Sequence, residues 1–145
     1  MAGEIADVIV VGAGNAAFCA ALSAQERGAR VLMLEAAPQE ESGGNSRFTA
    51  GSMRVVYNGV DDIRTLAPDL TPAEIVGTDF GTYTAEQFFD DMARLTRYRA
   101  DPDLVQLLVC ESFSTLNWMR QNGVRLRNTV GKVQKARLRE MLSAK

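Results

Sequence analysis

The chain has 145 residues, of which 46% are hydrophobic and 23% charged, and its net charge is −2. This size and mixture are those of one ordinary globular domain and exclude a disordered or fibrous chain. The slightly acidic balance disfavours nucleic acid as a partner. The absence of histidine and the presence of only two cysteines argue against a His-based triad, a metal site and a disulfide scaffold.

The first predicted elements are a strand, a helix and a second strand. Residues 7–11 are rich in β-branched side chains, which predicts a strand buried on both faces of a parallel sheet. The small apolar residues 18–24 predict a helix that ends at Gly28, and residues 29–34 predict the second strand. The fold class is therefore α/β: a Rossmann-like βαβ unit with an incomplete parallel sheet, followed by a mainly helical segment.

The uncharged stretch 8–24 is too short and too interrupted by glycine to span a bilayer, and acidic rather than basic residues precede it. We therefore expect neither a signal peptide nor a transmembrane segment, and we expect a cytoplasmic location.

A G-x-G-x-x-A turn joins the first strand to the helix. Gly12 permits the tight turn, Gly14 lets a pyrophosphate approach the backbone, and Ala17 keeps helix and strand close. Glu35 ends the second strand, where a carboxylate can accept hydrogen bonds from an adenosine ribose and disfavours NADP. These residues predict a dinucleotide site; an ordinary βαβ turn without a ligand is the alternative.

A second glycine-rich segment distinguishes FAD from NAD. Residues 43–46 read Gly-Gly-Asn-Ser, which allows several backbone N–H groups to turn inward as a cradle for an anion or heterocycle. An NAD domain would more often continue into a crossover helix and a third strand. The segment favours FAD over an NAD-binding module, with a flexible surface loop as the structural alternative.

Three motifs together resemble one flavoprotein family. They are G-A-G-N-A-A, G-G-N-S-R-F-T-A-G and T-D-F-G-T-Y-T-A-E-Q-F-F-D-D-M. The sequence resembles the FAD-dependent fumarate reductases and succinate dehydrogenases, in their soluble branch, from about residue 7 to about residue 126. The third motif is most similar to the tricarballylate dehydrogenases within that family.

The resemblance implies FAD as cofactor and a set of cofactor-binding residues. On the pyrophosphate and the ribose it implies Gly12, Gly14, Asn15, Ala16, Ala17 and Glu35. Around the pyrophosphate and flavin it implies Gly43, Gly44, Asn45, Ser46, Thr49, Ala50 and Gly51. Members that tether flavin covalently have a histidine where Asn45 stands, so the resemblance implies non-covalent FAD. Phe48 and Met53 are interpreted as packing residues.

The second half of the chain predicts helices. Capping residues start them at Thr71, Thr84 and Asp101, and the third is expected to continue until residues 122–123. Apolar residues at helical spacing are expected in the core: Phe88, Met92, Leu95, Leu104, Leu107, Leu108, Leu116 and Met119. Asp90 and Asp91 are expected on a solvated face, and residues 124–126 are expected to begin a strand.

The predicted organisation has three parts. Residues 1–60 form the FAD-binding unit, residues 61–126 start a capping domain, and residues 127–145 form a basic tail. The chain from residue 120 onward has eight basic and one acidic residue, against eight and 17 before it. The tail no longer resembles the family and is expected to be solvated or to meet an anionic surface. Either the chain is a truncated or frameshifted product with an unrelated tail, or it is a natural short relative that needs a partner.

The resemblance implies a dehydrogenase that oxidises a small polycarboxylate, tricarballylate-like, at a CH–CH bond. Its electron acceptor and catalytic residues are not identified. We expect this chain to lack the catalytic half and to be inactive alone. The alternative is a non-enzymatic FAD-binding fragment or subunit that needs a partner chain.

Overall fold

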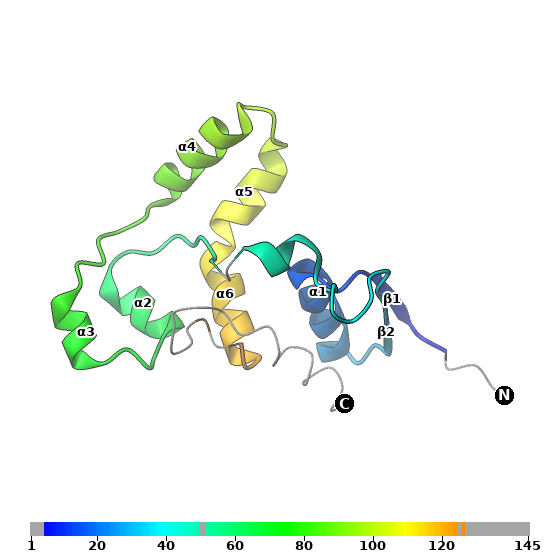
Figure 1. Cartoon of the computed structure of the whole chain (residues 1–145). Coiled ribbons are helices and arrows are strands. Elements are labelled where there is room, and N and C mark those ends of the chain that lie inside the picture. Colours follow the sequence, from blue (N-terminus) through cyan, green and yellow to red (C-terminus); the bar gives the residue numbers. More distant parts are fainter. Residues whose placement is uncertain (1–4, 50–51, 125, 127–145) are drawn as a thin grey trace. The chain divides into compact units, whose positions relative to one another are not determined.

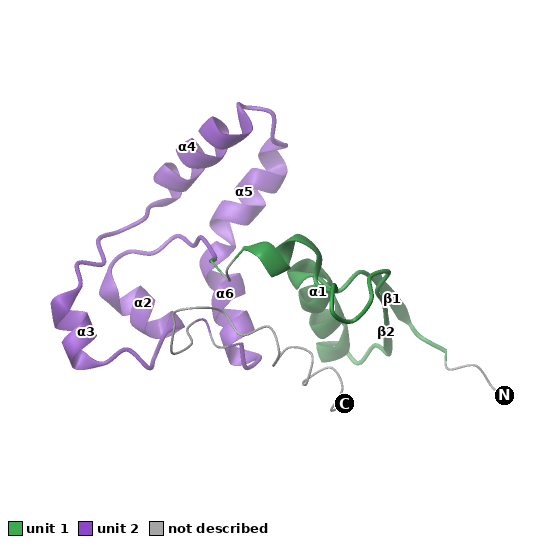
Figure 2. Cartoon of the chain, in the orientation of Figure 1, with its two compact units in different colours: residues 1–52, 128–145 green, residues 53–127 purple. Residues whose placement is uncertain are grey.

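A computed structural model describes residues 5–49, 52–124 and 126, which are drawn in colour in Figure 1. They fall into two compact units, with the boundary between Ser52 and Met53 (Figure 2). This boundary comes earlier in the chain than the one expected at residue 60. The predictions for Ala50, Gly51 and the tail at 127–145 lie outside the described residues.

The first unit contains the predicted strand, helix and strand. They are β1 (Val8–Val11), α1 (Asn15–Glu26) and β2 (Val31–Leu34). The two strands are parallel, with Val8 beside Val31, and α1 packs against both of them. The right order and direction confirm the α/β class and the βαβ unit at the N-terminus.

The two faces of this sheet differ in exposure. The alternate residues that lie on the less exposed face are Val8, Val10, Val31 and Met33. The exposed fractions on the other face are 60%, 82%, 45% and 48% for Ile9, Val11, Leu32 and Leu34. The expectation that the first strand is buried on both faces is therefore wrong for the described chain. The helix α1 covers a single face, and no other described helix of this unit covers the second.

Helix α1 supplies most of the buried side chains of the first unit. Phe18, Ala21 and Leu22 are buried against the sheet, and Cys19 is half-buried. Burial raises the pKa of the Cys19 thiol, because the thiolate would lose its hydration. The helix stops where Gly28 takes a positive φ of 82°, which glycine adopts without strain.

The second unit is helical, as expected (Figure 1). Its helices are α2 (Val60–Leu66), α3 (Pro72–Gly77), α4 (Ala85–Thr96), α5 (Pro102–Cys110) and α6 (Ser112–Gln121). An antiparallel bridge also joins Tyr57 to Tyr83. Helix α2 was missed by sequence reasoning, although acidic residues in its first turn follow Gly59, which is a usual start signal.

The predicted caps start three of these helices. Thr71 and Glu74 form a capping box at α3, and Thr84 and Gln87 form another at α4. The carboxylate of Asp101 accepts the first free N–H groups of α5. Side chains that satisfy these N–H groups fix the starting residue of a helix, which explains why sequence reasoning located them.

The third predicted helix is in fact two helices, α5 and α6, separated at Glu111. Ser112 begins α6, and its hydroxyl donates to the carbonyl of Val109 at 2.9 Å while accepting from the N–H of Val56 at 3.1 Å. A serine hydroxyl bonded in this way competes with the regular helical hydrogen bonds. The break therefore places Ser112, the one buried polar residue among the described ones, against the segment before α2.

The strand expected at residues 124–126 is not formed at Val124. Its N–H donates to the carbonyl of Met119 at 3.0 Å, and the preceding Gly123 has a φ of 81°. This is the end of a helix in which a left-handed glycine reverses the chain. Val124 is buried because it folds back on α6, and Arg125 lies outside the described residues.

The core of the second unit is smaller than the helical spacing suggests. Its buried apolar residues are Leu66, Phe88, Val109, Leu116, Met119 and Val124. Four leucines expected in the core are exposed: Leu95, Leu104, Leu107 and Leu108. Periodicity shows which residues share a face of a helix, but it does not show whether another element covers that face.

A cluster of charged and aromatic side chains surrounds Asp91. Its carboxylate accepts from Arg94 at 2.8 Å, from the Tyr83 hydroxyl at 2.8 Å and from Arg54. The Arg54 guanidinium also lies 5.2 Å from the centre of the Tyr83 ring. The expectation of a solvated pair is therefore wrong for Asp91, whereas its neighbour Asp90 is exposed.

These contacts make the second unit sensitive to acid. The hydrogen bond from Arg94, followed by that from Tyr83, lowers the pKa of Asp91 from 3.8 to about 2. A lowered folded-state pKa stabilises the fold above the unfolded value and loses that contribution as pH falls from about 4 towards 2. We expect Asp91→Asn to flatten the pH dependence of the thermal midpoint in that interval, measured by circular dichroism.

The matched control is Asp90→Asn, on the exposed neighbour. Its midpoint is expected to follow the parent at every pH. An Asp91→Asn chain that retained the parent's full loss of stability between pH 4 and pH 2 would contradict the role of this cluster.

No helix within the described ranges combines the length and the apolar character that crossing a membrane requires.

Candidate functional site

The glycine turn (residues 12–14) connects β1 to α1. Gly12 has a φ of 109°, which disfavours any side chain, and its N–H donates to the carbonyl of Leu34 at 2.6 Å. Gly14 precedes α1 with an ordinary φ of −83°. A methyl group added at Gly14 would lie 3.6 Å from the carbonyl of Gly43 and from the Ser46 hydroxyl. The backbone at Gly14 therefore faces the second glycine-rich segment.

That second segment, the loop of residues 43–49, is more regular than expected. Gly43 and Gly44 have φ values of 110° and 52°, and they lead into a short 3₁₀ helix, η1 (Gly44–Phe48). The Thr49 hydroxyl donates to the carbonyl of Ser46 at 3.1 Å. The Arg47 guanidinium donates to a backbone carbonyl before the loop, at residue 40. Left-handed glycines followed by these contacts fold the loop back towards α1.

A hydrogen bond joins the loop to the start of α1. The N–H of Asn15, the first residue of α1, donates to the Ser46 hydroxyl at 3.1 Å, and the contact is partly buried. Asn15 and Ser46 are 31 residues apart in the chain. The structure thus brings together two motifs that sequence analysis identified separately.

Glu35 lies at the same place, directly after β2. Its carboxylate accepts from the N–H of Ala37 at 3.0 Å. This hydrogen bond, followed by the influence of the backbone N–H groups of Ala13, Ala36 and Gly43, lowers the pKa of Glu35. The carboxylate is therefore ionised at neutral pH, and it interacts with both the glycine turn and the loop.

The free groups around the turn fit a dinucleotide. Within the described residues, the N–H groups of Ala16 and Ala17 in the first turn of α1 have no acceptor, and α1 has no acidic residue there. Free N–H groups and the helix dipole favour an anion such as a pyrophosphate. Gly14 has no side chain that would keep a pyrophosphate from the backbone before α1, and Glu35 supplies an acceptor for hydroxyl groups.

The structure brings some of the predicted site residues into contact and leaves others exposed. The contacts above involve Gly12, Gly14, Asn15, Glu35, Gly43 and Ser46. Asn45 and Thr49 are exposed in or next to η1. Phe48 is 82% exposed, so its interpretation as a packing residue is wrong for the described residues. Met53 is half-buried in the second unit.

Sequence reasoning missed the contributions of Ala13 and Ala37. Both act through backbone N–H groups towards Glu35, so their side chains carry no chemical signal. The only available indication was position, because Ala13 lies between the two glycines of the turn.

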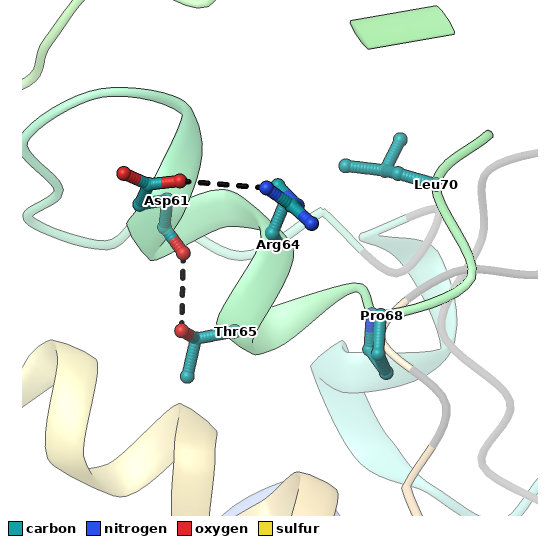
Figure 3. Close-up of a pocket in the computed structure, with 5 residues that line it drawn as sticks. All are labelled: Asp61, Arg64, Thr65, Pro68 and Leu70. Carbon is teal, nitrogen blue, oxygen red and sulfur yellow. Dashed lines mark hydrogen bonds and ion pairs between the residues drawn. The ribbon is translucent and has the colours of Figure 1, made fainter. Parts of the chain in front are cut away.

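The second unit has a pocket of about 400 Å³ beside α2 (Figure 3). It is lined by Asp61, Arg64, Thr65, Pro68 and Leu70. Arg64 lies 3.7 Å from Asp61, and the Thr65 hydroxyl donates to the Asp61 carbonyl at 3.0 Å. Both charged side chains are more than half exposed, so the pocket has no desolvated group aimed into it. It offers no chemistry comparable to that of the glycine turn and the loop.

Comparison with protein families gives a match over nearly the whole chain. A family model described as "FAD binding domain" matches residues 7–144. The match continues into the basic tail as far as residue 144. For this family match, the expectation that the likeness ends near residue 126 is therefore wrong.

Individual relatives agree with that match. The chain is 30% identical over 123 residues to a fumarate reductase (cytochrome) of Shewanella frigidimarina, covering 85% of this chain and 19% of that protein. It is 32% identical over 124 residues to a urocanate reductase of Eggerthella lenta, covering 81% of this chain and 16% of that protein. The chain therefore spans about a fifth of the length of these relatives.

A solved structure has the same fold. The open conformation of a flavocytochrome c3 fumarate reductase matches with a TM-score of 0.66 and 28% sequence identity. The alignment covers 96% of this chain and 24% of that one.

Proposed function

The chain belongs to the family of FAD-binding domains, whose cofactor is FAD, and we propose that its glycine turn and loop hold this cofactor for a flavin-dependent oxidoreductase. The observation that carries the proposal is the ionised Glu35 carboxylate, which interacts with both segments beside the free N–H groups of Ala16 and Ala17. An acceptor for ribose hydroxyls and donors for phosphates are the two requirements of an adenine dinucleotide.

The proposed roles follow from the chemistry of each group. The N–H groups at the start of α1 bind the pyrophosphate, Gly14 lets it approach, and Glu35 accepts from the ribose. The loop, including Gly43, Gly44, Asn45, Ser46 and Thr49, encloses the pyrophosphate and the flavin together with Ala50 and Gly51. When bound, FAD supplies the hydride chemistry, while the protein supplies binding and orientation.

We further propose that the flavin is not covalently attached. Asn45 carries an amide where covalent members have histidine, and an amide does not form the stable bond to flavin that an imidazole forms. Acid precipitation of the loaded protein is expected to leave the yellow colour in the supernatant.

For the complete protein we propose a reaction at a CH–CH bond of a small polycarboxylate. The named relatives reduce fumarate and urocanate, which supports an oxidoreductase acting on unsaturated carboxylates. A tricarballylate-like substrate and a separate electron acceptor remain our proposals for the same site. We expect this chain alone to bind FAD without turnover, so its flavin is expected to keep its colour when tricarballylate is added under anaerobic conditions.

The second candidate function is an FAD-binding subunit that acts only with a partner chain. The exposed aliphatic face of β1 and β2 favours it, because strands of such apolar composition are usually covered on both faces.

The role of Glu35 gives a direct test. We expect Glu35→Ala to weaken FAD binding by roughly 1.5–3 kcal/mol, the range for a hydrogen bond to a charged group. ADP is expected to lose affinity to a similar extent, because it contains the same ribose. FMN, which lacks the adenosine, is expected to bind the variant as it binds the parent. Fluorescence titration or calorimetry measures all three.

Glu41→Ala is the matched control, because Glu41 is an exposed glutamate in the same connection. Its affinity for FAD is expected to equal that of the parent. An equal affinity in Glu35→Ala as well would mean that the ribose binds elsewhere.

A further inference from the structure

The hydrogen bond between Asn15 and Ser46 has a consequence for how the site is assembled. Gly14 precedes α1 but has no side chain with which to cap it. The Ser46 hydroxyl provides the missing acceptor from 31 residues away, at 3.1 Å from the Asn15 nitrogen. Ser46 therefore satisfies one of the free N–H groups at the start of α1, as capping side chains do, although it comes from the loop and bonds to the first residue of the helix.

Other contacts hold Ser46 in position for this bond. The Thr49 hydroxyl donates to the Ser46 carbonyl at 3.1 Å, and Ser46 itself lies within η1 and is half-buried. The loop begins with two left-handed glycines, which have more backbone freedom than any other residues when the loop is open. A loop of this kind needs contacts to its surroundings in order to stay closed.

Because of this bond, the first N–H groups of α1 differ in whether they already have an acceptor. The N–H of Asn15 is occupied by Ser46, whereas those of Ala16 and Ala17 have no acceptor among the described residues. The resemblance had implied that Asn15 contacts the pyrophosphate. In this structure its N–H is directed to the loop.

We propose that Ser46 is a positioning residue that closes the loop on the start of α1 before the dinucleotide binds. The closed loop leaves the N–H groups of Ala16 and Ala17 for the phosphates and presents the rest of the loop to the cofactor. This proposal rests on the proposed function, because it assigns a preorganising role within the same FAD site. When only a fraction of the chains has the loop closed, the apparent affinity for the dinucleotide is reduced by that fraction.

The test uses the full chain with Ser46→Ala and Ser46→Thr. In the free protein, exchange of the Asn15 amide hydrogen is expected to be faster in Ser46→Ala and close to the parent in Ser46→Thr. The dissociation constant for FAD is expected to rise roughly three- to tenfold in Ser46→Ala, the factor that corresponds to one hydrogen bond. The threonine hydroxyl is expected to restore the parent's affinity.

Ser42→Ala is the matched control. The Ser42 hydroxyl donates to the Gln39 carbonyl at 3.0 Å, so it belongs to the connection before the loop and does not cap α1. Both the exchange rate of the Asn15 amide and the FAD affinity are expected to equal those of the parent.

The role of Ser46 alone would be overturned by an FAD affinity in Ser46→Ala that equals the parent's, or by one that exceeds it because the hydroxyl competes with the phosphate. An unchanged exchange rate of the Asn15 amide would show that the bond does not close the loop. A parent chain that binds no FAD would overturn the proposed function itself and this role with it.

Discussion

The Gly14→Val chain is expected to fold and to lose FAD binding. The backbone at Gly14 has a φ of −83°, which valine adopts, and a methyl group there would make ordinary contacts of 3.6 Å with the loop. Valine is also a poorer residue than glycine before a helix, which costs about 1 kcal/mol. The branched side chain would instead stand beside the Gly14 backbone, which is where the pyrophosphate is proposed to approach.

The expected loss of affinity is at least about 100-fold, or roughly 2.8 kcal/mol, measured by titration with FAD. The matched control is Gly77→Val at the end of α3, where an added methyl group would meet nothing within 4 Å. This variant is expected to bind FAD as the parent does. A folded Gly14→Val chain with the parent's affinity would contradict the assignment of the glycine turn.

The Phe88→Ala chain is expected to lose most of the stability of the second unit. Phe88 is 3% exposed, and its ring lies 5.5 Å from that of Tyr83. Removing a buried phenylalanine costs about 3–5 kcal/mol, through lost burial and the cavity that remains. The single tryptophan, Trp118, lies in α6 of the same unit, so its fluorescence during urea unfolding reports this loss.

Phe48→Ala is the control of identical chemistry, because Phe48 is 82% exposed in η1. Its unfolding is expected to change by less than about 0.5 kcal/mol. If the two variants had equal midpoints, or if Phe48→Ala were the less stable, the burial of Phe88 in the core would be contradicted.

Sequence reasoning located those elements whose signals are local. The strand, helix and second strand at the N-terminus follow from short-range composition, and the helices that begin after Thr71, Thr84 and Asp101 follow from their capping residues. In each case the residues that decide the structure lie within one or two turns of the element.

What sequence reasoning could not predict depends on contacts between distant residues. The break between α5 and α6 involves Ser112 and Val56, and the hydrogen bonds of Asp91 include one from Arg54. The exposure of Leu104, Leu107 and Leu108 depends on the absence of a covering element among those described. None of these facts is visible in a window of neighbouring residues.

The candidate site likewise combines features that local sequence signals indicate with features that depend on distant contacts. The glycine turn and the loop were recognised as separate motifs, each from its own glycines. Their union through Asn15 and Ser46, and the backbone N–H groups that surround Glu35, came only from the structure. Backbone donors have no residue-specific signature, so no sequence motif could have indicated that Ala13 and Ala37 take part.

The central claim is that the glycine turn and the loop together form a working FAD site, and the visible absorption spectrum tests it most directly. The purified chain is incubated with FAD, freed of excess cofactor by gel filtration, and its spectrum is recorded before and after acid precipitation. We predict flavin bands that stay with the protein and pass into the supernatant after acid. A folded, colourless protein that retains no flavin would contradict the claim.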